Sequence, residues 1–134
     1  MATFTLRIVS PEKVVLEAEV DAVRFPGEDG FIGVLAKHAP MVALTESEVL
    51  TAKMTGGENL DLLIHDGFAE VRNDVLTVLT RSAEEPREVD LERAREAAER
   101  AEQRLQLNRA EYDHARAMAA LRRAIARQKY GSRS

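Results

Sequence analysis

The first 80 residues of the chain alternate short apolar runs with turn-forming residues. Runs rich in β-branched and apolar residues occupy 3–9, 13–19, 21–25, 31–35, 49–54, 60–65, 68–72 and 75–80. Between them lie turn signals, of which the clearest are 26–30, 55–59 and 73–74. No stretch before residue 87 is long enough for a crossover helix. The pattern therefore predicts an antiparallel β-sandwich or barrel rather than a βαβ fold.

The pattern changes to a helical period after residue 86. Neither Gly nor Pro occurs from Arg87 to Tyr130, and Asp90 is a favourable N-cap. Apolar residues then recur at spacings of three and four, first at Leu91, Ala94, Ala98, Ala101 and Leu105, and later at Ala117, Leu121 and Ala124. Polar residues gather at 106–113, where we expect a turn. We predict two domains, a sandwich at 1–86 and an antiparallel helical hairpin at 87–134.

The composition of the hairpin indicates how tightly its two helices pack. Of the 20 alanines, 11 lie between Ala94 and Ala126. Alanine lets helices approach closely but buries about a third of the apolar area of leucine. We therefore expect a weakly packed hairpin that can adopt more than one arrangement.

Net charge divides at the same place as the secondary structure. The total of −4 hides 8 basic and 16 acidic residues in 1–89, and 11 basic and 7 acidic residues in 90–134. An acidic domain is thus joined to a basic one. The acidic total and the scarcity of aromatic residues in the hairpin argue against nucleic acid as a partner.

Several classes of chemistry are excluded or disfavoured. The chain has no cysteine, so disulfides and thiol nucleophiles are absent. The three histidines, His38, His65 and His114, lack metal-ligand spacing, and we expect structural or surface roles and no metal site. Motifs for serine hydrolases and phosphate-binding loops are missing, so we predict no catalytic residues. We also expect no signal peptide and no insertion into a membrane.

Arginines recur along both predicted helices. Arg93 and Arg100 are seven residues apart, as are Arg109, Arg116 and Arg123, and Arg127 follows one turn later. Like charges at this spacing destabilise an isolated helix slightly, so something should compensate. Three explanations stay open: a solvated basic face, an acidic partner surface, or a phosphate-bearing ligand held by guanidinium groups.

With these residues in view, the chain resembles the epsilon subunit of F-type rotary ATP synthases over nearly its whole length. The resemblance rests on the order and spacing of several short motifs, at 9–13, 25–30, 38–40, 66–71 and 76–79, followed by the alanine–arginine hairpin. It implies a ten-stranded β-sandwich followed by two C-terminal helices, in agreement with the pattern above.

The resemblance also implies a function. Members of this family are non-catalytic rotor subunits whose sandwich touches gamma and the c ring at the foot of the central stalk, during proton-driven ATP synthesis. This implies a peripheral location on the cytoplasmic face of the bacterial plasma membrane, and no required cofactor. By the same resemblance, Phe31, His38 and Met41 are expected at the rotor interface.

The family's hairpin can fold against the sandwich or extend along gamma into the catalytic head, where it inhibits ATP hydrolysis. In the extended state, basic residues of the second helix meet acidic segments of the alpha and beta subunits. Here the resemblance assigns that basic face to Arg116, Arg122, Arg123 and Arg127.

Some family members also bind ATP on the folded hairpin, through an aliphatic–Asp–x–x–Arg–Ala motif. Residues 89–94 match this motif, with Asp90 and Arg93 at its polar positions. Further arginines of the pattern fall on Arg100, Arg123 and Arg127. The upstream acid of the pattern falls on Glu84 or Glu85, and both stay open as candidates, with Glu84 named among the nucleotide-binding residues. ATP is then expected as a regulatory ligand.

Two positions depart from the family pattern. Lys37 stands where the family usually has glycine, and because positive φ is strained for lysine, we expect a different local turn. Phe31 stands where many members have a polar residue, and we expect it to form an apolar docking patch with Met41. The alternative function is a free-standing nucleotide-sensing adaptor, which would not form a stoichiometric complex with gamma.

Overall fold

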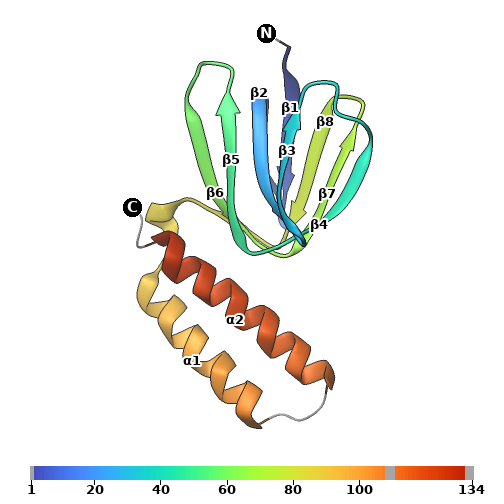
Figure 1. The fold of residues 1–134 in the computed structure, drawn as a ribbon. Helices are drawn as coiled ribbons and strands as arrows, with labels where there is room; N and C mark the ends of the chain where they lie inside the picture. Colours follow the sequence, from blue (N-terminus) through green and yellow to red (C-terminus); the bar gives the residue numbers. More distant parts are fainter. Residues whose placement is uncertain (1, 108–110, 132–134) are drawn as a thin grey trace. The chain divides into compact units, whose positions relative to one another are not determined.

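The computed structural model describes residues 2–107 and 111–131. The chain forms two compact units that divide between Glu84 and Glu85. The first unit consists of β-strands and the second of helices, and each is described below by itself (Figure 1).

Nine strands form the first unit within the described residues. They are β1 Phe4–Val9, β2 Val14–Gly27, β3 Gly30–Leu35, β4 Met41–Thr45, β5 Glu48–Met54, β6 Asn59–Ile64, β7 Gly67–Arg72, β8 Val75–Thr80 and β9 Ala83–Glu84. Hydrogen bonds join them in the order β1-β8-β7-β4-β2-β5-β6-β9, and β2 also pairs with β3 and β1. The predicted sandwich is confirmed.

Strand β2 belongs to both layers of the sandwich. Its first half pairs with β1, and its second half pairs with β3 on one side and β5 on the other. The register with β5 shifts between Val20 and Ala22, so that Val20 and Val23 are both buried although three residues apart. This bulge lets one strand bend from one layer into the other.

The bulge explains one difference from the sequence-based prediction. Separate strands were predicted at 13–19 and 21–25, from their content of β-branched and apolar residues. The structure has one continuous strand, since a bulge interrupts alternation without ending the pairing. The described residues hold nine strands, where the family resemblance implied ten.

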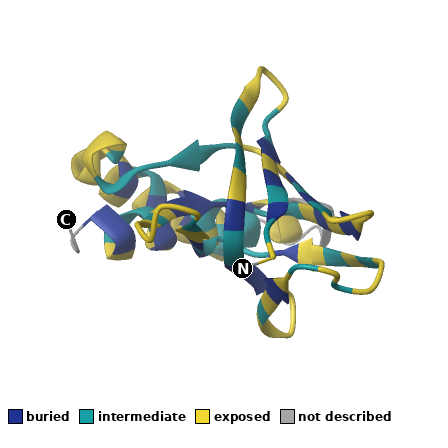
Figure 2. Ribbon diagram, turned by 90° about the horizontal axis from the view of Figure 1, so that it is seen from above, coloured by how far each residue is buried: buried dark blue, intermediate teal, exposed yellow. Residues whose placement is uncertain are grey.

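Side chains that point inward from the strands fill the space between the layers. Buried residues alternate with exposed ones along the strands (Figure 2). Phe25 is fully buried, and the core around it contains Phe4, Leu6, Ile8, Val20, Val23, Val34, Leu50, Ala52, Leu62, Ile64, Ala69, Val71, Leu76 and Val78.

The predicted hairpin at 73–74 is confirmed. Asn73 and Asp74 have φ of 53° and 58°, the two positive values that a type I′ turn requires between β7 and β8. By contrast, β4 and β9 were not predicted. β4 contains Met41–Thr45 within a segment lacking strong alternation, and β9 is two residues long.

The second unit contains a short 3₁₀ turn, Pro86–Glu88, followed by α1 Leu91–Leu107 and α2 Glu111–Gly131. The helices are antiparallel and pack side by side (Figure 1). The predicted alanine seam is confirmed at its centre, because Ala94, Ala98, Ala101, Ala117 and Ala124 are buried. Leu91 is exposed instead, and of the predicted turn at 106–113, residues 108–110 lie outside the described residues.

Gly67 makes the closest backbone approach in the sandwich and gives a stability test. A Cβ atom at this position would lie 1.9 Å from the carbonyl oxygen of Leu79. We expect Gly67→Ala to lower the free energy of unfolding by about 1–3 kcal/mol, because the backbones must separate. Urea denaturation of the purified chain measures this.

Gly56 supplies the matched control, because no atom lies within 4 Å of a Cβ built there. Gly56→Ala should change stability by no more than roughly 0.5 kcal/mol. Equal effects of the two substitutions would contradict the close approach at Gly67.

Candidate functional site

The arginines of α1 lie beside the alanine seam. A helix turns by about 100° per residue, so Arg93 and Arg100 share one side of α1, about a quarter turn from the line of Ala94, Ala98 and Ala101. Both arginines are exposed, whereas the three alanines are buried. The two guanidinium groups therefore flank the contact between the helices.

On α2, three of the four predicted basic residues form a stripe. Arg116, Arg123 and Arg127 follow at spacings of seven and four and lie on one side of the buried Ala117 and Ala124. Arg122 precedes Arg123 directly and therefore points about 100° away from the stripe. The predicted inhibitory face is thus a stripe of three arginines with Arg122 apart from it.

The arginines of both helices lie on the same face of the pair. On α1 and on α2 they are displaced from the alanine seam by a similar angle and in the same rotational sense. Because the helices are antiparallel (Figure 1), the same sense on each brings the two sets to one face. The structure thus brings Arg93 and Arg100 to the same face as Arg123 and Arg127.

The other flank of α1 carries paired charges. Arg95 donates hydrogen bonds to Glu92 and, at 2.7 Å, to Glu99 Oε1. The hydrogen bond from Arg95, assisted by its charge, holds the pKa of Glu92 below its ordinary value. These glutamates neutralise Arg95, and they lie about 100° around the helix from Arg93 and Arg100, the residues that directly follow them.

Asp90 is the N-cap of α1, as predicted. Its Oδ1 accepts a hydrogen bond from the backbone N–H of Arg93 at 3.0 Å, and its carbonyl accepts one from Ala94 at 3.0 Å. The carboxylate therefore satisfies one of the free N–H groups at the start of the helix.

Glu84 lies in the sandwich unit and takes part in a buried polar cluster. Its Oε1 accepts a hydrogen bond from Nε2 of the fully buried His65 at 3.2 Å, while His65 Nδ1 lies 3.0 Å from Ser47 Oγ. The backbone of His65 is bound by the hydroxyls of Thr45 and Thr80. His65 thus has the structural role expected, and the described residues contain no group of three metal-ligating side chains.

Glu85 lies at the start of the 3₁₀ turn. Its backbone N–H donates to Glu88 Oε1 at 2.8 Å, and its carboxylate forms an ion pair with Arg87 at 2.8 Å. The two candidate acids therefore differ in surroundings: Glu84 is held by a buried histidine, and Glu85 by an exposed arginine.

The predicted rotor-interface residues lie at two ends of the sandwich. Phe31 is half exposed at the start of β3, and the guanidinium of Arg24 lies 3.9 Å from the centre of its ring. The turn that precedes Phe31 meets the end of β4, where Thr45 pairs with Gly27. Met41 starts β4, at the opposite end of that strand, and pairs with Val71. Phe31 and Met41 therefore do not form one patch.

His38 lies near Met41, in the loop between β3 and β4. Its Nδ1 is 2.7 Å from the carbonyl oxygen of Ala39. The preceding residue, Lys37, has φ of 64°, so the expectation of a different turn is wrong: lysine adopts the left-handed conformation that glycine favours. A hydrogen bond from Lys37 N–H to Asp74 Oδ1, at 2.6 Å, accompanies this conformation.

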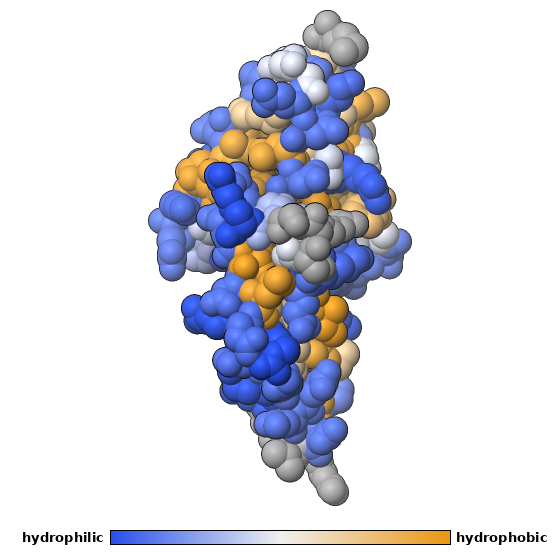
Figure 3. All heavy atoms as spheres, turned by 90° about the vertical axis from the view of Figure 1, so that its left-hand side faces the viewer, coloured by the Kyte–Doolittle hydropathy of each residue, from blue (hydrophilic) through white to orange (hydrophobic). Residues whose placement is uncertain are grey.

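An exposed apolar row crosses five strands on the outer side of one layer. Its members are directly paired neighbours: Leu44 on β4, Phe68 on β7, Leu79 on β8, Val9 on β1 and Val14 on β2. Four of the five are about half exposed, and Val9 is partly buried. The sequence analysis did not predict this row. One signal was present on β7, because Phe68 lies on the same strand face as the charged and exposed Glu70 and Arg72. The face drawn in Figure 3 also shows hydrophobic residues exposed among hydrophilic ones.

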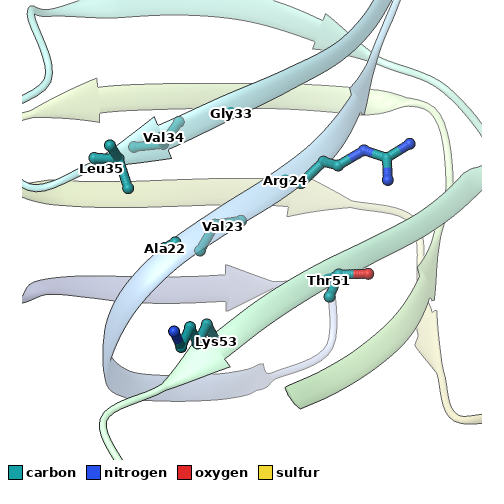
Figure 4. Close-up of a pocket in the computed structure, with 8 residues that line it drawn as sticks. All are labelled: Ala22, Val23, Arg24, Gly33, Val34, Leu35, Thr51 and Lys53. Carbon is teal, nitrogen blue, oxygen red and sulfur yellow. The ribbon is translucent and has the colours of Figure 1, made fainter. Parts of the chain in front are cut away.

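The outer side of the other layer carries an open groove of about 410 Å³. Strands β2, β3 and β5 form its floor, and Gly33 leaves space beside the exposed Leu35 (Figure 4). Arg24 and Lys53 contribute positive charge to it. The groove is mainly apolar and presents no set of groups suited to catalysis.

Comparison with known proteins gives a consistent result for both units. Residues 3–86 match the family model described as ATP synthase, Delta/Epsilon chain, beta-sandwich domain. Residues 87–129 match the model described as ATP synthase, Delta/Epsilon chain, long alpha-helix domain.

Curated relatives match over almost the whole chain. The ATP synthase epsilon chain of Moorella thermoacetica is 43% identical over 129 residues, covering 96% of each chain. That of Bacillus cytotoxicus is 45% identical over 127 residues, covering 95% of each.

Solved structures show the same fold. A chain in the Euglena gracilis mitochondrial ATP synthase, in a structure of OSCP, F1 and the c ring, aligns with a TM-score of 0.78 and 26% identity, covering 94% of this chain and 79% of that one. A chain in the central stalk and c ring of the Tetrahymena thermophila enzyme aligns with a TM-score of 0.56 and 13% identity, covering 63% and 68%.

Proposed function

The chain belongs to the ATP synthase delta/epsilon chain family, and on that premise we propose that it is a non-catalytic rotor subunit that couples gamma to the c ring for proton-driven ATP synthesis. Curated relatives of the same length are named ATP synthase epsilon chain. A similar chain stands in a structure of F1 with its c ring. Both observations support the proposal.

The observation that carries this proposal is the apolar row from Leu44 to Val14. Contiguous exposed apolar surface on a small sandwich is typical of a protein interface. We assign the row to gamma, because it spans five strands and so offers a rigid surface. Phe31, stacked on Arg24 at one end of the sandwich, is assigned to the c ring, and His38 and Met41 at the other end complete the rotor contacts.

We place the subunit peripherally on the cytoplasmic face of the bacterial plasma membrane. The described residues contain no helix long and apolar enough to span a membrane. Association through gamma and the c ring would hold the subunit there, and bacterial relatives support this assignment.

Assembly tests the proposal. We expect the wild-type chain to co-purify with gamma in a stable stoichiometric complex, and Phe68→Ser to raise the Kd for gamma about tenfold, as loss of a central apolar contact does. Phe31→Ser should weaken retention of the c ring. Kinetic binding assays with reconstituted gamma and c ring measure both.

Leu35→Ser is the control for this test, because Leu35 is 65% exposed but lies outside the row. It should leave both affinities unchanged. An intact rotor with Phe31→Ser would overturn the assignment of Phe31. Failure of the wild-type chain to bind gamma would favour the alternative function, a free-standing nucleotide-sensing adaptor.

We further propose that α2 inhibits ATP hydrolysis when the hairpin extends. The stripe of Arg116, Arg123 and Arg127, with Arg122 beside it, would then meet acidic segments of the alpha and beta subunits. Close alanine packing between α1 and α2 favours such a rearrangement, since alanine seams lose little apolar burial when they separate.

Substitution of Arg116 and Arg122 tests the inhibition separately from ATP binding, because neither residue belongs to the proposed ATP site. In reconstituted F1, the double variant Arg116→Ala/Arg122→Ala should raise ATP hydrolysis relative to wild type, and added salt should do the same by screening the charges. Arg95→Ala is the control, because Arg95 is neutralised on the other flank of α1. Unchanged hydrolysis in the double variant would contradict the assignment.

We also propose that ATP is a regulatory ligand of the folded hairpin. Arg93, Arg100, Arg123 and Arg127 lie on one face of the helical pair, and their guanidinium groups suit bidentate binding of phosphate. Asp90 and one of the two candidate acids, Glu84 or Glu85, would complete the set that the family motif implies. Since ATP would bind the folded state alone, it would favour that state in proportion to its concentration over its Kd.

Calorimetry tests ATP binding. We expect heat on titration with millimolar ATP, and Arg123→Ala should weaken binding at least about tenfold, as loss of a charge-assisted hydrogen bond does. Arg95→Ala should bind as wild type does. Asp90→Ser keeps a good N-cap but removes the carboxylate, so it separates capping from ligand binding. Absence of heat with the wild-type chain would contradict this proposal.

A further inference from the structure

The loop that carries His38 is held in a strained conformation. Lys37 has φ of 64°, in the left-handed region that residues with a Cβ atom rarely adopt. Such a conformation persists where surrounding contacts determine it. The contact in this case is the hydrogen bond from Lys37 N–H to Asp74 Oδ1, at 2.6 Å, which joins residues 37 positions apart in the chain.

Asp74 is itself fixed on two sides. It is the second central residue of the type I′ turn between β7 and β8, with φ of 58°. Its carbonyl oxygen accepts a hydrogen bond from the backbone N–H of Thr5 at 3.0 Å, which ties the turn to the start of β1. The carboxylate that receives Lys37 is therefore presented from a rigid position.

We propose that Asp74 is a positioning residue for the rotor contact formed by His38 and Met41. Lys37 directly precedes His38, and Met41 begins β4 only four residues after Lys37. Holding the Lys37 amide fixes the course of this short connection and hence the place where His38 is presented. Asp74 acts through the loop and makes no contact with the partner. The inference rests on the proposed function, because it concerns the same interface.

The turn offers variants that separate positioning from hairpin stability. Asn-Gly is the preferred pair for a type I′ turn, so Asp74→Gly keeps the turn type while it removes the side chain and with it the carboxylate. Asp74→Asn keeps an oxygen that can accept from Lys37. Asn73→Gly introduces glycine into the same turn while leaving the carboxylate in place.

Two measurements on these variants test the proposal. Hydrogen exchange of the Lys37 amide should rise about tenfold in Asp74→Gly, the order of effect for losing a charge-assisted hydrogen bond, with β5 and β6 unchanged. The rate of dissociation from a reconstituted complex of gamma and c ring should rise about threefold, since interface changes act mainly on dissociation. Asp74→Asn and Asn73→Gly should resemble wild type in both.

The outcomes distinguish this inference from the proposed function. Unchanged Lys37 exchange in Asp74→Gly, or faster exchange with unchanged dissociation, overturns the positioning role while the proposed function stands. Faster dissociation of Asn73→Gly to the same extent would show an effect of the turn alone and also overturns it. If the wild-type chain does not bind the complex, the proposed function fails, and the positioning role fails with it.

Discussion

The fold depends on one strand that serves two layers. Because β2 pairs with β1 in its first half and with β3 and β5 in its second, the two layers are joined by continuous backbone as well as by side-chain packing. The bulge at Val20–Ala22 allows both Val20 and Val23 to point inward, which a strict alternation would forbid. The positions of two outer surfaces of the sandwich follow from this bend. It places the apolar row on the outside of one layer and the groove beside Arg24 on the outside of the other.

Features set by local chemistry could be predicted from the sequence. The positive φ values at Asn73 and Asp74, the cap at Asp90 and the alanine seam depend on near neighbours along the chain. Features set by pairing between distant strands could not. Phe31 and Met41 are close in sequence, but β4 runs from Met41 to Thr45, which pairs with Gly27 in the turn before Phe31. Met41 therefore lies at the end of β4 far from that turn and from Phe31. The apolar row is likewise visible only once the register of five strands is known.

Charged side chains are distributed unevenly around α1. On one flank of α1, Glu92 and Glu99 neutralise Arg95; on the other, Arg93 and Arg100 share a face with the arginines of α2. Glu96 lies near Arg93 and Arg100 on α1, three residues after the first and four before the second, so this face is mainly basic rather than of one sign. The mainly basic face agrees with the excess of basic residues in 90–134, which the sequence already showed.

The end of the sandwich has a mechanical consequence. β9 is held to β6 by two residue pairs, Leu63 with Glu84 and Ile64 with Ala83, and the linker to the helices leaves directly from it. Tension in that linker would peel so short a strand first. The hydrogen bond from the buried His65 to the Glu84 side chain adds a further attachment to this backbone pairing. The last strand of the sandwich is therefore held by a side chain as well as by its backbone.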